Sequence, residues 1–600
     1  MPPPPIPYTL RIGVTGHRTL PDPGVTAVSV RAALVELRQI LERVSEDPHH
    51  PPGAGETPLT RWEGRCARRL KQLLTLAEIL PAETPSPRRT ELRWRVISPL
   101  ARGADRIVAR VAQEHFGAKL DVILPFSKTE YERDFATADD LAEFQTLLAG
   151  AARRREPDPE LVAISPEMRA AGYQRVGEQV VAACEILLAV WDGRPARGPG
   201  GTAEIIQYAL SVNCPVVWVH AHDPTQPACL LTQLVGEGDK AFAKRETRPL
   251  AEIMDEFCRP FAQLAEYNRD RAYNPAEFQQ IYRRNQHRLE RARDQAGLAS
   301  GMIQPRIEIL LAHYAWSDQL AIHYQQLHLR AGTGIYRLSA LAVGVAVAQQ
   351  LFFPEHTGWI ALEIASLLCA VGWFRVGACE NWHRKWLNYR HLAERLRTRL
   401  FTSLVPPKPN KDSPNPVPSL EFYPGPGRWV EAAFGELEAE LPPPPDLTAN
   451  FAAIKGFVRH GWILDQIDFH AGSSDRKAHL AHSAHQRIAF MLIVTLIAGG
   501  LHWLEAVELP LGVLVIAAVA IILPAIASAE HAIGGLHDYE RIATRSAGMA
   551  GLLRRIDRAL AEAATEADQQ DVIERAERIV STENHEWCVS LSFHPPGPPV

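Results

Sequence analysis

Four long apolar segments dominate the hydropathy pattern of the second half of the chain. They cover residues 337–353, 358–374, 487–504 and 509–528. Each has about the length that a helix needs to cross the ~30 Å hydrocarbon core of a bilayer. The connector within each pair is only a few residues long, so the segments form two hairpins. The pattern predicts an all-α membrane region with four transmembrane helices.

The charges around these segments predict their orientation. The two connectors read Pro-Glu-His-Thr and Glu-Ala-Val-Glu and contain no Lys or Arg, whereas Arg337, Arg375 and Arg487 flank the opposite ends. Basic residues collect on the cytoplasmic side of membrane proteins. We therefore expect a multi-pass protein with both termini in the cytoplasm. The alternative, two hairpins buried in a large soluble core, does not account for this asymmetry.

The two hairpins also resemble an internal repeat. Each is followed by a polar helical segment with a Tyr, an Ala four residues later and an Arg two residues after that: Tyr389, Ala393 and Arg395, then Tyr539, Ala543 and Arg545. Duplication of one supersecondary unit would give a pseudo-symmetric four-helix membrane unit. We expect homo-oligomerisation to complete it.

Residues 8–222 show a different pattern, in which short apolar runs alternate with amphipathic segments. The predicted strands are residues 8–16, 93–100, 119–126, 185–193 and 214–221. Apolar strands that alternate with helices predict a Rossmann-like α/β fold, with a parallel sheet covered on both faces. Such sheets bind ligands at the carboxyl ends of their strands.

Three glycine-containing loops follow predicted strands, at residues 13–18, 98–105 and 198–204. Glycine lets the backbone approach a ligand closely, and the helix N-terminus beyond it offers unpaired N–H groups to an anion. Arg18 and Arg102 could add charge-assisted contacts to a phosphate. Each loop alone is an ordinary turn, but three at one sheet edge predict an anion-binding site.

The segments GVTGHR, SPLARGADRIVARVA and GPGGTAEIIQYA resemble the SLOG superfamily, which includes the lonely-guy phosphoribohydrolases and the Rossmann domains of DNA-processing protein A. The resemblance covers residues 8–222. It implies a small nucleotide or nucleotide-derived ligand, whose identity the sequence does not give, and no certain cofactor beyond it. By position it assigns ligand contacts to Gly16, His17, Arg18, Arg102, Gly103, Asp105, Gly200, Gly201, Thr202 and Glu204.

The third loop departs from the hydrolase pattern Pro-Gly-Gly-x-Gly-Thr-x-x-Glu. From Pro199 to Glu204 the chain reads Pro-Gly-Gly-Thr-Ala-Glu, so one glycine is missing and the Glu lies one residue closer to the Thr. One residue of offset rotates a helical side chain by about 100°. Two functions stay open. In a sensor, Glu204 would bond a ribose hydroxyl or stabilise the helix N-terminus; in a membrane-anchored nucleotide N-glycoside hydrolase, Glu204 would be catalytic.

The membrane half resembles the SLATT effector domains (SMODS and SLOG-associating two-transmembrane). The clearest resemblance lies at residues 305–402, and the second hairpin resembles them more loosely. Those domains are thought to form pores in bacterial nucleotide-dependent conflict and antiphage defence systems. The resemblance implies a sensor–effector of the bacterial inner membrane, which binds its ligand in the cytoplasm and gates or perturbs the lipid bilayer.

Composition argues against two other classes of partner. A net charge of −5 gives no general attraction for nucleic acid. The eight cysteines form no CxxC pair, and a group of nearby histidines lacks a closed ligand set, so we expect no metal site. These histidines are His470, His479, His482 and His485.

The expected organisation has seven parts. They are a proline-rich tail (1–7), a SLOG-like nucleotide-sensing domain (8–222), a helical linker (223–330), the first hairpin with its cytoplasmic helix (331–403), a proline-rich linker (404–450), the second hairpin with its cytoplasmic helices (451–575) and a C-terminal tail (576–600).

Overall fold

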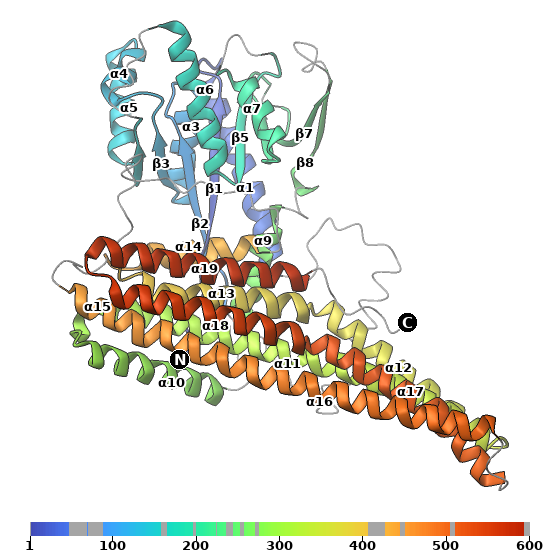
Figure 1. Cartoon of the computed structure of the whole chain (residues 1–600). Coiled ribbons are helices and arrows are strands. Elements are labelled where there is room, and N and C mark those ends of the chain that lie inside the picture. The colour runs from blue at the N-terminus through green and yellow to red at the C-terminus, as the bar shows by residue number, and fades with distance from the viewer. Residues whose placement is uncertain are drawn as a thin grey trace.

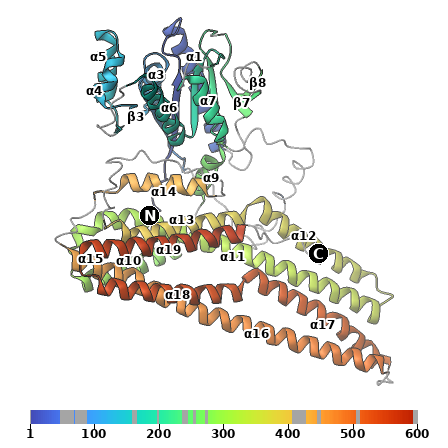
Figure 2. The same cartoon turned by 45° about the horizontal axis from the view of Figure 1, so that its top comes forward.

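A computed structural model describes most of the chain. The described residues are 2–46, 69, 88–157, 165–195, 200–223, 225–235, 244–252, 257–270, 275–405, 427–443, 450–504 and 510–592. Figure 1 shows an α/β domain standing on a long bundle of helices, from which two hairpins extend side by side. The turned view in Figure 2 shows the same two layers and the two hairpins leaving the bundle on the same side.

The α/β domain contains one eight-stranded sheet in the order β4-β3-β2-β1-β5-β6-β7-β8. The six strands from β4 to β6 run parallel, and β7 and β8 are antiparallel. This confirms the predicted class, a mostly parallel α/β sheet followed by a helical region. The strands are β1 Tyr8–Gly16, β2 Leu92–Ser98, β3 Lys119–Ile123, β4 Arg153–Arg155, β5 Ile186–Trp191, β6 Val216–His220, β7 Cys229–Val235 and β8 Lys244–Pro249.

Helices cover both faces of the sheet, because its central strands are apolar on both sides. In β5, Leu188 and Val190 pack in the layer of α1 and α3, whereas Leu187 and Ala189 pack in the layer of α6 and α7. The helices of this domain are α1 Pro23–Glu46, α3 Ala104–Phe116, α4 Lys128–Tyr131, α5 Ala138–Ala149, α6 Pro166–Ala183 and α7 Thr202–Ser211.

Three strands were not predicted. The edge strand β4 consists of three arginines and carries no apolar signal. The strands β7 and β8 lie inside residues 223–330, which we expected to form a helical linker; instead they extend the sheet as an antiparallel pair. The sequence of β8, Lys-Arg-Glu-Thr-Arg-Pro, is polar, as is common for a strand at the edge of a sheet; β8 is one edge of this sheet and β4 is the other.

The bundle contains the four predicted membrane segments, each within a helix that is long and apolar enough to cross a bilayer. In each of these helices, only 11% to 28% of the most apolar stretch is buried against the rest of the protein. Most of the apolar surface therefore faces outward, as expected of a helix that contacts lipid. The bundle helices are α9 Arg259–Arg269, α10 Pro275–Ala296, α11 Ser300–Phe352, α12 Gly358–Cys379, α13 Trp382–Thr402, α14 Arg428–Glu440, α15 Phe451–Val458, α16 Leu464–Trp503, α17 Pro510–His537, α18 Tyr539–Glu562 and α19 Glu566–Ser592.

The two hairpins follow the same path. In the first, α11 is followed by α12 and then by α13, which packs back on α11. In the second, α16 is followed by α17 and then by α18, which packs back on α16. A residue with positive φ precedes the third helix of each. The positive-φ residues are Asn381, at 54°, and Asp538, at 51°. Tyr539 is the first residue of α18, whereas Tyr389 lies about two turns into α13, so the short sequence match is out of register with this junction.

Two helices run across expected domain boundaries. The helix α11 continues without a break across residues 330 and 331, where we placed the end of the linker. The helix α19 extends to Ser592, so most of the expected C-terminal tail (576–600) is helical. The connector Glu-Ala-Val-Glu of the second hairpin lies outside the described residues.

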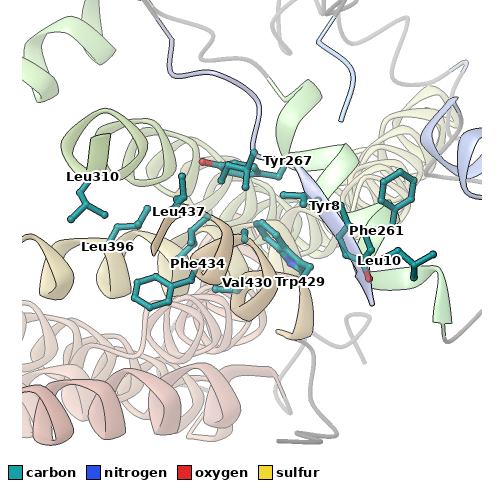
Figure 3. Packing of buried hydrophobic residues seen from close by; sticks show 14 of the residues in the cluster. Tyr8, Leu10, Phe261, Tyr267, Leu310, Leu396, Trp429, Val430, Phe434 and Leu437 are labelled. Atoms are coloured by element: carbon teal, nitrogen blue, oxygen red, sulfur yellow. The ribbon is translucent and has the colours of Figure 1, made fainter. Parts of the chain in front are cut away.

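The α/β domain is docked on the bundle through apolar packing. Figure 3 shows Tyr8 and Leu10, at the start of β1, beside Phe261 of α9 and Trp429 of α14. The rings of Tyr8 and Phe261 meet edge to face, with centroids 5.2 Å apart. One cluster of buried side chains therefore runs from the sheet into the bundle, so that the two parts pack as one body.

Candidate ligand-binding cavity

A cavity of about 560 Å³ lies at the carboxyl ends of β1 and β5. From β1 the chain proceeds outward through β2 and β3 to β4, then returns to β5 on the other side of β1. The cavity therefore lies at the topological switch point, where open α/β sheets bind their ligands. Its size lies within the usual range of small-molecule sites.

Most of the residues that the sequence assigned to a ligand site line this cavity. They are Gly16, His17, Arg18, Asp105, Gly200, Gly201 and Thr202. Arg102, Gly103 and Glu204 do not line it. Arg102 is 60% exposed in its side chain, and its Nε lies 3.5 Å from a carboxylate oxygen of Asp140. The three predicted loops thus converge, but not all of their residues face the cavity.

Gly16 and Gly103 bring the first two loops together. Gly103 precedes α3 with φ 86° and ψ −119°, a conformation open almost only to glycine. A Cβ at Gly103 would lie 2.5 Å from the carbonyl oxygens of both His17 and Arg18, and a Cβ at Gly16 would lie 2.4 Å from the Cβ of Ala104. These glycines therefore let the β1 loop pack against the start of α3.

The side of the cavity next to α7 is suited to an anion. Gly200, Gly201 and Thr202 form the N-terminal end of α7, where helix N–H groups and the helix dipole favour negative charge. The Arg18 guanidinium lies 4.6 Å from the centre of the Tyr173 ring, so its position is set by a cation–π contact. Both Arg18 and Tyr173 line the cavity.

His17 and Asp192, which also line the cavity, form a pair. His17 Nε2 lies 3.0 Å from Asp192 Oδ1 and 3.1 Å from the Asp192 backbone nitrogen. Burial raises the pKa of Asp192, but hydrogen bonds from the Arg194 N–H and from His17 more than offset this, so the pKa is lowered. Asp192 is therefore a carboxylate at neutral pH, which can orient the imidazole or accept from a ligand hydroxyl.

Glu204 interacts with its own loop. Its Oε2 accepts a hydrogen bond of 2.7 Å from the backbone N–H of Gly200, and its side chain is exposed. This contact fits the expectation that Glu204 stabilises the helix N-terminus better than it fits a catalytic carboxylate in the cavity. Residues 196–199, which include Pro199, lie outside the described residues.

The sequence did not single out Tyr173, Asp192 or His222, which also line the cavity. Asp192 follows directly on β5, so the rule that ligands lie at strand carboxyl ends could have identified it. Tyr173 lies in the middle of α6 and becomes part of the site only through packing.

Within the described ranges, no three His, Cys, Asp or Glu side chains lie close enough together to hold a metal ion.

Asp105 is the buried acid of the cavity. Its side chain accepts a hydrogen bond of 3.2 Å from the Ala101 N–H, and the residue is only 4% exposed. Burial raises its pKa to about 7. Near neutral pH a large share of Asp105 is therefore uncharged, which lowers the repulsion that a phosphate would meet beside it.

This burial predicts a pH-dependent effect of Asp105→Asn. In the folded protein the pKa of Asp105 is about 7, above its ordinary value of 3.8. The stability of the wild type therefore falls as the pH rises from about 4 to about 7, and it stays level above that. Asn keeps the acceptor but carries no charge. We expect the variant to gain up to about 4 kcal/mol over the wild type at pH 8 and almost nothing at pH 4.

Thermal melts of the full chain in detergent at several pH values measure this difference. Asp139→Asn, at an exposed position of α5, is the matched control and should shift neither curve. A gain of equal size at pH 4 and pH 8 would show that Asp105 is not protonated in the folded protein.

The comparisons with known proteins bear on the second hairpin. Residues 461–587 match the family described as SMODS and SLOG-associating 2TM effector domain 1, SLATT_1. The match covers most of the segment from α16 to α19. No curated protein matches the chain. We expected the clearest similarity at residues 305–402, but the matched segment is the other hairpin. The chain thus contains a domain similar to two-transmembrane effectors, and with its four apolar helices it has the features of a membrane protein.

Proposed function

We propose that this protein is a sensor–effector of the bacterial inner membrane. Its cavity binds a nucleotide-derived ligand, and binding changes how the hairpins gate or perturb the bilayer, in a defence role. The observation that carries the proposal is the pairing of two features in one packed core: a cavity at the switch point of the sheet, and a hairpin similar to two-transmembrane effectors.

The ligand's phosphate would lie between the N-terminus of α7 and Arg18. Gly200, Gly201 and Thr202 supply the helix end, and Arg18 supplies the positive charge. The rest of the ligand would occupy the cavity beside Tyr173 and Asp192. No metal or further cofactor enters this proposal. The protein would act as a homo-oligomer with both termini in the cytoplasm.

A binding assay tests whether the protein is a sensor, and a leakage assay tests whether it is an effector. Arg18→Gln should weaken nucleotide binding 10- to 100-fold, because a charge-assisted hydrogen bond contributes about 1.5–3 kcal/mol. Arg102→Gln is the matched control: the same change in a neighbouring loop, but on a side chain that does not line the cavity. The full chain in detergent is titrated with nucleoside monophosphates and NAD, with the melting temperature as readout.

Leakage is then measured with the full chain in liposomes that contain a dye. Dye release that depends on nucleotide in the wild type, and that is lost in Arg18→Gln, supports the sensor–effector. Binding without any release would refute the effector half. Release of free base that Glu204→Ala abolishes would instead identify a nucleotide N-glycoside hydrolase, which the exposed position of Glu204 argues against.

A further inference from the structure

The helix α9 connects the α/β domain to the bundle. On one side Asn268 pairs with the Ile6 backbone just before β1: its Oδ1 accepts from the Ile6 N–H at 2.9 Å, and its Nδ2 donates to the Ile6 carbonyl at 2.8 Å. On the other side the Tyr267 hydroxyl lies 2.8 Å from the Ser317 hydroxyl of α11. The helix α9 is therefore bonded both to the α/β domain and to the long helix α11 of the bundle.

Four charged residues meet where α9 ends. Arg384 donates to Glu266 at 2.8 Å. Lys385 Nζ lies 3.2 Å from Glu266 Oε1 and 3.1 Å from Asp270 Oδ1, and Lys385 is only 4% exposed. The Tyr389 hydroxyl also donates to Asp270. We call Glu266, Asp270, Arg384 and Lys385 the α9–α13 cluster.

The two helices place these charges at ends that disfavour them. Glu266 and Asp270 lie at the C-terminal end of α9, where the helix dipole opposes negative charge. Arg384 and Lys385 lie in the first turn of α13, where the dipole opposes positive charge. Each pair is compensated mainly by the opposite charges on the other helix, and Lys385 also donates to the Tyr324 hydroxyl of α11 at 3.2 Å. The arrangement therefore favours contact between α9 and α13.

Lys385 is fully charged in this setting. Burial lowers its pKa, but Asp270 and Glu266 more than offset this, so that the pKa is raised above its ordinary value. A buried ammonium ion between two carboxylates is strongly held, and loss of one partner leaves an uncompensated buried charge. The cluster therefore resists separation of α9 from α13.

The cluster lies at the base of the first hairpin. The membrane helix α12 ends at Cys379, Asn381 makes the turn, and α13 begins at Trp382. At the same place in the second hairpin, Arg541 pairs with Asp538 of its own turn at 2.6 Å and is 47% exposed in its side chain. The two hairpins thus share a path but differ in what holds their bases.

We propose that the α9–α13 cluster is an ion lock that holds the base of the first hairpin to α9, the bundle helix that is hydrogen-bonded to the α/β domain through Asn268. The lock transmits the state of the cavity to the membrane, a second step that rests on the function proposed above. The first hairpin is the one that receives the signal from the α/β domain, whereas the segment similar to effectors is the second.

Hydrogen exchange of the full chain without nucleotide tests the lock itself. Lys385→Met keeps the length of the side chain but removes its charge. We expect exchange in α9 and in the first two turns of α13 to become at least 10-fold faster, with α16 and α17 unchanged. Arg541→Met, at the corresponding junction of the second hairpin, is the matched control and should leave α9 unchanged. Unchanged exchange in Lys385→Met, or an equal effect of Arg541→Met, would overturn the proposal.

A charge rescue separates the lock from simple packing. Asp270→Asn in the Lys385→Met background removes the acid that has lost its partner. The double variant should recover at least half of the lost protection, measured as the logarithm of the exchange rate. If the second substitution adds to the loss, the side chains act through packing and not as an ion pair.

Leakage tests the transmission step. The full chain is placed in vesicles of phosphatidylethanolamine and phosphatidylglycerol, with entrapped calcein and with AMP or NAD as probe. Lys385→Met should shift the melting temperature with the probe as the wild type does, while the ratio of release with and without probe falls to about one. A wild-type protein that never leaks would refute the proposed function and the transmission step alone, because the exchange experiment still decides the lock. A ratio like that of the wild type would refute transmission.

Discussion

Gly103→Ala should lower the melting temperature of the α/β domain by roughly 10 °C. The conformation of Gly103 is costly for any residue with a Cβ, by about 1–3 kcal/mol. The clash with the carbonyl oxygens of His17 and Arg18 adds a similar amount, because backbone on both sides must move. A loss of about 3–5 kcal/mol corresponds to this shift in a domain of 150–250 residues.

Gly117→Ala is the control for Gly103→Ala. Gly117 also has positive φ, 63°, but a Cβ there would meet nothing within 4 Å. The substitution Gly117→Ala should therefore lower the free energy of unfolding only by the cost of the left-handed backbone conformation, about 1–2 kcal/mol. Circular dichroism melts of the full chain compare the two. Equal losses would show that the β1 loop and α3 can move apart freely, and then Gly103 would not set the shape of the cavity.

Arg306→Met is expected to loosen α14 from the bundle at a cost of about 3 kcal/mol. The buried Arg306 guanidinium donates to the Ser403 carbonyl at 2.6 Å, to the Pro442 carbonyl, and to the Pro443 carbonyl at 3.5 Å. These carbonyls lie just beyond α13 and α14. Methionine fills much of the space but leaves the buried acceptors without this donor.

Limited proteolysis of the full chain measures that change. Cleavage between residues 427 and 443 should become at least 10-fold faster, because α14 would leave its site more often. Arg284→Met, the same substitution at an exposed position of α10, should change nothing. If the two variants are cleaved at the same rate, the three carbonyl contacts of Arg306 do not hold α14.

The parts of the fold that the sequence predicted are those with a strong apolar period. The central strands are buried on both faces, and the membrane segments are long apolar runs, so composition alone identifies them. The strands β4 and β8 were not predicted because they are polar edge strands, and β7 was not predicted although it pairs with both β6 and β8. The continuity of α11 and α19 was not predicted, because a helix can pass from an apolar to a polar environment without any break in its backbone.

The candidate site shows where sequence reasoning ends. The loops after β1 and β5 were predicted, because their position follows from the order of strands and helices. The roles of single residues were not, since they depend on distances across the fold. Gly103 proves to be a packing residue, Arg102 faces Asp140, and Glu204 binds the Gly200 N–H. The cavity residues Tyr173 and Asp192 come from segments that carry no motif.

The central strand β1 has a consequence for how the protein would respond to its surroundings. Its Gly16 end lines the cavity, its Tyr8 end packs beside α9 and α14, and neighbouring strands pair with it on both sides. A paired strand of nine residues is a stiff strut roughly 30 Å long. Coupling between two sites is reciprocal by thermodynamic necessity. Under the function proposed above, a strand that transmits ligand binding toward the membrane also transmits in the other direction, so bilayer thickness and tension would change the affinity of the cavity for its ligand.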